Sequence, residues 1–226
     1  MAERKISVIG LGGVGSILIN FLSRYLNWVK DDSYTITLID GDEYEEKNLL
    51  RQEFTIFTNK AEAKREELQA KFPNIVFECV NEHISEDNLY KLDSSDTIFI
   101  CVDNHTTRAL LNGYAKMRDN LVVISGGNEY TDGNVQIYAR FGGKDVTPDL
   151  AAYHPEIATP SDKHPDEMSC EELHSSSPQL LFTNMSVATL MLWAYYSTFV
   201  SHSVGVSEIY FDMITMKVDC KIRQIK

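Results

Sequence analysis

The sequence has only four cysteines, and no two of them form a CxxC motif. Cys79, Cys101, Cys170 and Cys220 are scattered along the chain, and the first two lie in apolar, strand-like runs. This spacing excludes a disulfide framework and a four-cysteine zinc site. Three histidines lie near Cys170 in the sequence, but their spacing fits no standard zinc pattern.

Positive charge is also scarce. The chain has 21 Lys and Arg against 33 Asp and Glu, which gives a formal net charge of −12. Nucleic-acid and anionic-membrane binders normally use a basic face, so this balance disfavours both partners. The first residues, MAERKISVIG, lead straight into a strand-like run without the apolar core and cleavage site of a signal peptide. We therefore expect a cytoplasmic protein that binds neither nucleic acid nor a membrane.

The chain has one long apolar run, Leu180 to Val200. Six threonine, serine and asparagine residues interrupt this run, and no basic anchors flank it. We therefore expect a helix buried in the core or in a subunit interface rather than a membrane span.

The length and composition favour one large domain. The 226 residues are 43% hydrophobic, which is enough for a sizeable core. We expect residues 1–226 to form a single domain, with a proline-punctuated crossover loop at 142–178. A loop of this length without its own elements is typically functional or disordered.

Short apolar runs rich in β-branched residues alternate with helix-like segments along the first half of the chain. This alternation predicts an α/β, Rossmann-like fold with a mostly parallel twisted sheet, helices on both faces, and antiparallel strands at the end. Asp132-Gly133 is the expected turn pair of a hairpin. Strands are expected at 5–10, 34–40, 74–80, 97–102, 121–125, 128–131, 134–141, 208–211 and 215–222, helices up to about residue 28 and at 61–72, 105–117 and 180–200, and a short helix or turn at 84–92.

A glycine-rich turn, Gly10-Leu-Gly12-Gly13-Val-Gly15-Ser16, joins the first strand to the first helix. Glycines let the backbone turn tightly and approach an anionic ligand, whose charge the helix N-terminus stabilises. The motif fits any nucleotide-binding Rossmann unit. A turn needed only for helix–strand packing is the alternative interpretation.

The most informative stretch is Ile36 to Gln52, a buried strand that runs into an acidic loop. In open α/β sheets, ligands bind outside the carboxyl ends of the strands, so Asp40 would lie where a nucleotide ribose binds. Arg51 would then face the phosphates. A plain dinucleotide-binding protein has no evident use for Asn48 and Arg51 after the acid.

Two further segments carry candidate site residues. The helix expected at 61–72 has a charged side that includes Lys60, Lys64 and Lys71, and we expect most of it to be solvated, with Lys64 as the exception. The strand at 97–102 ends at Asp103-Asn104. Asp103 has two interpretations, as the N-cap of the next helix or as a metal ligand at a strand's carboxyl end.

Together, the glycine loop, the run IDGDEYEEKNLLRQ, Lys64 and the run CVDNHTTR resemble the ThiF/MoeB/HesA superfamily, which includes the adenylating domain of ubiquitin-activating enzymes. The resemblance extends in order and spacing from Lys5 to about Arg140. It resumes at Ser169-Cys170 and the helix that starts near Leu180.

The resemblance implies that ATP and Mg²⁺ are used to adenylate the C-terminal carboxylate of a ubiquitin-like or sulfur-carrier protein, with release of pyrophosphate. Because relatives pair through their helices and late strands, it also implies a homodimer. The implied roles are the nucleotide loop for Gly10, Gly12, Gly13 and Gly15, ribose binding for Asp40, phosphate binding for Asn48, Arg51 and Lys64, support of Arg51 for Gln52, and the magnesium site for Asp103.

Cys170 lies in the crossover loop, where relatives that carry a transfer cysteine have it. The resemblance therefore suggests a covalent role for Cys170, in which its thiol takes the acyl group from the adenylate as a thioester. Neighbouring Glu167, Glu171 and Glu172 would raise the thiol pKa and oppose this role. An unreactive loop cysteine is the alternative.

Three alternatives remain beside the adenylating enzyme with a protein substrate. The same chemistry could act on a peptide or a modified transfer RNA. A nicotinamide-dependent dehydrogenase would use the same glycine loop and Asp40, but Asn48, Arg51 and Lys64 argue against it. A non-catalytic relative that binds a partner would have no reason to keep Arg51, Lys64 and Asp103.

Overall fold

The computed structural model describes residues 3–29, 33–50, 54, 57–167 and 180–225. A nine-stranded sheet runs through these residues in the order β3-β2-β1-β4-β5-β6-β8-β9, with β7 paired to β6. Its strands are β1 Glu3–Ile9, β2 Ser33–Ile39, β3 Ile75–Val80, β4 Thr97–Ile100, β5 Leu121–Asn128, β6 Asp132–Phe141, β7 Lys144–Asp145, β8 Glu208–Asp212 and β9 Lys217–Lys221.

The first five strands pair in parallel, and β6, β7, β8 and β9 pair antiparallel. The four residues of β4 are buried on both faces, as expected for a central parallel strand. The chain runs from β1 outward to β2 and β3, then returns to the other side of β1 with β4. This reversal makes the carboxyl ends of β1, β2 and β4 a topological switch point, where ligands bind in open α/β sheets.

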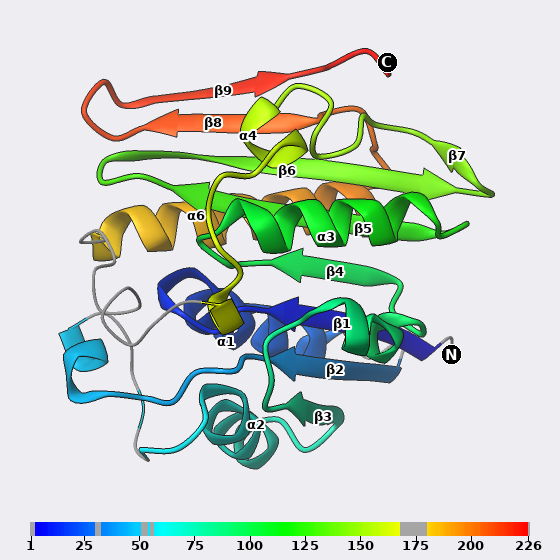
Figure 1. Cartoon of the computed structure of the whole chain (residues 1–226). Coiled ribbons are helices and arrows are strands. Elements are labelled where there is room, and N and C mark those ends of the chain that lie inside the picture. Colours follow the sequence, from blue (N-terminus) through cyan, green and yellow to red (C-terminus); the bar gives the residue numbers. More distant parts are fainter. Residues whose placement is uncertain (1–2, 30–32, 51–53, 55–56, 168–179, 226) are drawn as a thin grey trace.

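Helices cover both faces of the sheet, which confirms the predicted fold class (Figure 1). One apolar core includes side chains from α1, α2 and α6, and a second, on other sheet positions, includes side chains from η2, α3 and α4. The helical segments are α1 Gly13–Trp28, η1 Glu46–Leu50, α2 Lys60–Lys71, η2 Glu86–Leu92, α3 His105–Lys116, α4 Pro155–Ala158, η3 Pro165–Glu167 and α6 Leu181–Phe199.

The predicted hairpin turn is wrong by two residues. Asp132 and Gly133 belong to β6, and the turn lies between Glu129, whose N–H donates to the Asp132 carbonyl, and Asp132 itself. A Cβ at Gly133 would lie 2.5 Å from the Gly127 carbonyl oxygen and 2.8 Å from the Phe211 ring. The glycine is therefore needed for the close packing of β5, β6 and β8, not for the turn.

The expected crossover loop contains short elements of its own in its described part, namely β7, α4 and η3. The apolar run at its far end forms α6, which packs beside α1 against the sheet. Among the described residues, none of the helices combines the length and the apolar character that a membrane span requires.

Candidate nucleotide site at the carboxyl ends of the strands

The glycine loop joins β1 to α1 and crosses close to β4. Gly10 has a φ of +86°, and a Cβ there would lie 3.0 Å from the Cys101 carbonyl. A Cβ at Gly15 would lie 1.9 Å from the Gly10 carbonyl oxygen. These two glycines are therefore required by the protein's own packing, while Gly13 is the first, buried residue of α1.

Gly12 is different from its neighbours in the loop. It is the N-cap of α1, its φ of −70° is open to any residue, and a Cβ there would meet no atom within 4 Å. Neither conformation nor packing within the protein explains this glycine. The open space beside it, at a helix N-terminus, is suited to the close approach of an anionic ligand.

Asp40 fastens the glycine loop to the end of β2. One carboxylate oxygen accepts the Leu11 N–H at 2.6 Å, and the other accepts the Asp42 N–H at 2.9 Å. Burial raises the pKa of Asp40 and the charge of Asp42 adds to the rise, whereas Lys60 and the two backbone hydrogen bonds lower it; the net direction is upward. The predicted ribose-binding residue is thus in place at the carboxyl end of β2, next to the loop.

The acidic segment beyond Asp40 returns along the start of α2. Glu43 and Asn59 form an isolated antiparallel bridge, and the Tyr44 N–H donates to the Thr58 carbonyl. Buried Asn48 accepts the Glu45 N–H at 2.8 Å and so stabilises the turn into η1. Its predicted partners in the phosphate site, Arg51 and Gln52, lie outside the described residues.

Two lysines in the first turns of α2 are buried, Lys60 and Lys64. They are four residues apart and therefore lie on one face of the helix. Lys60 pairs with Asp42 at 2.6 Å, and Lys64 pairs with Glu67 at 2.7 Å. The prediction that Lys60 belongs to a solvated face is wrong, because the acidic segment packs over this end of the helix.

The side chain of Lys64 is 1% exposed. Its partner Glu67 also bonds Lys71, and although burial would raise the pKa of Glu67, the two lysines hold it below the usual value. Burial first, and then the charges of Asp40 and Glu67, raise the pKa of Tyr44. Tyr44 therefore lies near both carboxylates, between the Lys64–Glu67 pair and the end of β2.

Asp103 lies just beyond the end of β4 with an exposed side chain. The N-cap of α3 is Asn104, whose side chain accepts the Thr107 N–H at 2.8 Å, so the N-cap interpretation of Asp103 is wrong. Burial lowers the pKa of Arg108, and the charge of Asp103 only partly opposes this shift. Burial also lowers the pKa of Lys60, but the charges of Asp40, Asp42 and Asp103 outweigh it. Arg108 itself is buried and donates to the backbone carbonyls of Val102 and Gly126, which fixes the start of α3 against β5.

The crossover segment is tied to the same edge of the sheet. Asp162 accepts the backbone N–H groups of His105 and Thr106 at the N-terminus of α3. His164 contacts the Ile84 carbonyl at 2.8 Å. Cys170, the predicted transfer cysteine, lies outside the described residues.

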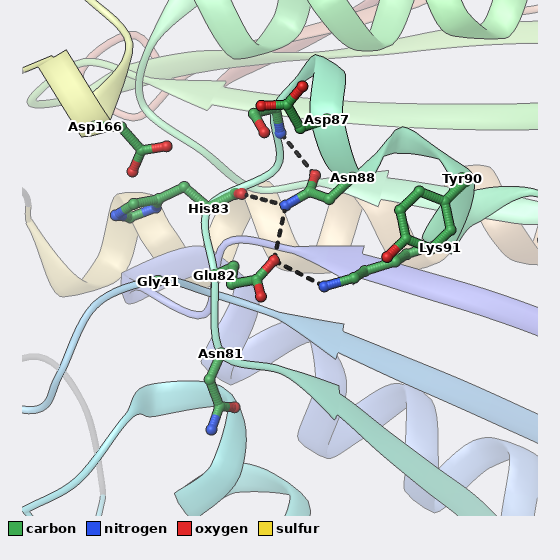
Figure 2. A pocket seen from close by; sticks show the side chains of 10 residues that line it. Gly41, Asn81, Glu82, His83, Asp87, Asn88, Tyr90, Lys91 and Asp166 are labelled. Atoms are coloured by element: carbon green, nitrogen blue, oxygen red, sulfur yellow. Dashed lines mark hydrogen bonds and ion pairs between the residues drawn. The ribbon is translucent and has the colours of Figure 1, made fainter.

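An open pocket of about 500 Å³ lies where β2 and β3 end (Figure 2). Gly41, the Asn81–His83 segment and η2 line it, together with Asp166 from the crossover segment. The side chain of Asn88 stabilises the wall of this pocket by donating to the His83 carbonyl and to Glu82. Glu82 also pairs with Lys91. Lys64 and Asp103 are not among its lining residues.

No group of three or more His, Cys, Asp or Glu side chains that could hold a metal ion occurs within the described part of the chain. Asp103 is thus not part of a cluster of three or more such side chains in the described part of the chain. This fits Mg²⁺ better than zinc, because Mg²⁺ is commonly held by one or two carboxylates plus substrate phosphates and water.

Sequence reasoning missed three residues that organise this edge: Lys60, Asn59 and Asp162. Asn59 could have been found, because an asparagine directly before a helical run is a typical N-cap. Lys60 and Asp162 carried no such signal, since both act on segments distant in sequence.

Comparisons with known proteins identify the family of this chain. Residues 1–213 match the ThiF family. The chain is 29% identical over 149 residues to adenylyltransferase and sulfurtransferase UBA4 of Yarrowia lipolytica, covering 63% of this chain and 35% of that protein. It is 30% identical over 139 residues to the tRNA threonylcarbamoyladenosine dehydratase of Haemophilus influenzae, covering 58% of this chain and 51% of that protein.

Solved structures show the same fold at low identity. A crystal structure of E. coli MccB with ATP superimposes with a TM-score of 0.75 at 19% identity, covering 99% of this chain and 63% of that chain. This chain thus spans from about a third to under two thirds of the length of these relatives.

Proposed function

Because this chain belongs to the ThiF family, we propose that it uses ATP to adenylate the C-terminal carboxylate of a ubiquitin-like or sulfur-carrier protein and releases pyrophosphate. One observation carries the proposal. A continuous set of hydrogen bonds connects the glycine loop to Asp40, Asp40 to Asp42, and Asp42 to the start of α2. These bonds bring the loop, Asp40, Asp42 and Lys60 together at one edge of the sheet, and Lys64 follows one turn later on α2.

The residues fit a nucleotide. The open side of Gly12 gives a phosphate access to the N-terminus of α1, and Asp40 offers a carboxylate for the ribose hydroxyls. Asn48, Arg51 and Lys64 are assigned to the phosphates, with Gln52 in support of Arg51. Asp103, beyond β4, is assigned to hold the magnesium ion that accompanies ATP.

The reaction needs positive charge at the α-phosphate. A carboxylate is a weak nucleophile, and the phosphate oxygens gain negative charge as the new bond forms. Lys64 and Arg51 would neutralise this charge, and Mg²⁺, when bound, would add its own. Removal of one such group is expected to lower the rate by about a hundredfold or more.

The proposed substrate is a flexible tail with a free carboxylate. The same chemistry would serve a short peptide. The formal charge of −12 argues against a transfer RNA, because RNA binding depends on basic surfaces.

We further propose that Cys170 accepts the acyl group. Its thiolate would attack the acyl carbon of the adenylate, the bond from that carbon to the phosphate oxygen would break, and AMP would leave. A thiol-sensitive adduct on a non-reducing gel, absent from Cys170→Ala, would support this step. An adduct that persists in the variant would contradict it.

A homodimer is also proposed. Exposed side chains recur along one side of α6 at Phe182, Met185, Trp193 and Tyr196. The ring of Tyr25 in α1 contacts both Tyr196 and exposed Trp28, so this side continues to the end of α1. An apolar stripe of this kind is typical of a protein interface. Analytical ultracentrifugation at micromolar concentration should give twice the monomer mass of 25.7 kDa.

The decisive experiment has two stages. Calorimetric titration with a non-hydrolysable ATP analogue and MgCl₂ should show binding, weakened by Asp103→Asn. ATP–pyrophosphate exchange should depend on an added carrier with a free C-terminus and fall about a hundredfold in Lys64→Met. Lys116→Met is the matched control, because this lysine pairs with Asp149 at the far end of α3. Absence of nucleotide binding by the wild type would refute the proposal.

A further inference from the structure

Lys60 occupies an unusual environment for the first residue of a helix. Its side chain is 9% exposed, and its Nζ lies 2.6 Å from an Asp42 carboxylate oxygen. A lysine is rarely this buried unless it is paired. The ion pair with Asp42 is therefore what allows Lys60 to be buried in this fold.

The backbone around Lys60 is tied to the same partner. The Lys60 N–H donates to the Asp42 carbonyl at 2.9 Å. The Asn59 side-chain amide donates to the carbonyls of Asp40 and Asp42 at 2.8 and 3.1 Å. The start of α2 and the end of β2 thus form one hydrogen-bonded unit.

The charges of this unit converge on Lys60. Burial lowers the pKa of Lys60, but the charges of Asp40, Asp42 and Asp103 outweigh it, so the net shift is upward. The same ammonium opposes the rise that burial causes in the pKa of Asp40. Lys60 thus pairs directly with Asp42, and the charges of Asp40 and Asp103 also stabilise its charged form.

We propose that Lys60 is a positioning residue of the nucleotide site, which holds Asp42 and, through it, Asp40 in the arrangement that receives the nucleotide ribose. The inference rests on the proposed function. Lys60 donates to the Asp42 carboxylate, the Asp42 N–H donates to Asp40, and Asp40 accepts the Leu11 N–H, so the cation of α2 acts on the glycine loop through Asp42 and Asp40.

The test is the pH dependence of nucleotide affinity in Lys60→Met. Without the ammonium, Asp40 ionises less readily, so the affinity for a non-hydrolysable ATP analogue should fall about tenfold or more near neutral pH. The acid limb of its pH profile should move to higher pH. Other titratable groups near the pair are His83, 3.5 Å from Asp42, and Tyr44. His83→Gln therefore serves as the control for histidine titration.

Two further variants separate charge from folding. Lys60→Arg keeps the cation and should restore affinity and the wild-type profile. Lys60→Met/Asp42→Asn removes both charges, so its loss should be smaller than the sum of the single losses. Lys116→Met should behave like the wild type.

The outcomes are distinguishable. A wild-type protein that binds no nucleotide overturns the proposed function and this inference with it. A wild type that binds, with an unshifted acid limb in folded Lys60→Met, overturns the inference alone. If Lys60→Met does not fold, Asp42→Asn carries the test, because it removes the other half of the 2.6 Å pair. Wild-type affinity with an unshifted acid limb in folded Asp42→Asn then overturns the inference.

Discussion

Asn59 is predicted to stabilise the protein more than an ordinary helix cap. Its side-chain oxygen accepts the N–H groups of Ala61 and Glu62 at 2.9 and 3.2 Å, which is the capping role. Its amide also donates to the carbonyls of Asp40 and Asp42. The two functions can be separated by substitution.

The expected magnitudes follow from these contacts. Loss of an N-cap costs about 1 kcal/mol, and each net hydrogen bond contributes about 1 kcal/mol. The Asp42 carbonyl keeps the Lys60 N–H as a partner, so the loss of its second donor costs less. Asn59→Ala should therefore lower the free energy of unfolding by about 2–3 kcal/mol, and Asn59→Ser, which keeps the cap, by about 1–2 kcal/mol.

Asn104 provides the matched control, because it caps α3 through the single N–H of Thr107. Asn104→Ala should cost about 1 kcal/mol, and Asn104→Ser close to nothing. Urea denaturation at constant m-value measures all four variants. Equal midpoints for Asn59→Ala and Asn104→Ala would refute the argument that Asn59 ties α2 to the end of β2.

Three further predictions address the loop, the thiols and the crossover segment. Gly15→Ala should destabilise the fold by several kcal/mol because its Cβ meets backbone, whereas Gly12→Ala should keep wild-type stability and lose affinity for the ATP analogue; wild-type affinity in Gly12→Ala would contradict the nucleotide loop. Burial raises the pKa of Cys101 to about 12, so iodoacetamide at pH 8 should label exposed Cys220 and leave Cys101 unmodified, as read by peptide mass spectrometry. Burial would raise the pKa of Asp162, but its hydrogen bonds to the N-terminus of α3 lower it. The stabilisation of the protein by Asp162 should therefore be present at neutral pH and vanish as the pH falls below about 4. Thermal melts of Asp162→Ala and the wild type should converge at that low pH, and parallel curves of melting temperature against pH would contradict this.

The order of elements could be predicted from local sequence. The run at 97–102 is apolar on both faces, which is typical of a central strand in a parallel sheet, and β4 indeed lies between β1 and β5. The glycine loop and the position of Asp40 at the end of β2 also followed from local spacing. The Asp132-Gly133 turn failed because the glycine serves packing between strands, which a dipeptide does not reveal.

The sequence by itself determined the fold class, the family resemblance and the position of Asp40 at the end of a strand, because each depends on short runs of neighbouring residues. Only the tertiary structure decided the burial of Lys60 and the hydrogen bonds of Asp162 to the N-terminus of α3. Lys60 meets Asp42 across 18 residues, and Asp162 meets His105 across 57. Such pairs form only after separate elements have packed, so the charge partners depend on the folded arrangement and not on local periodicity.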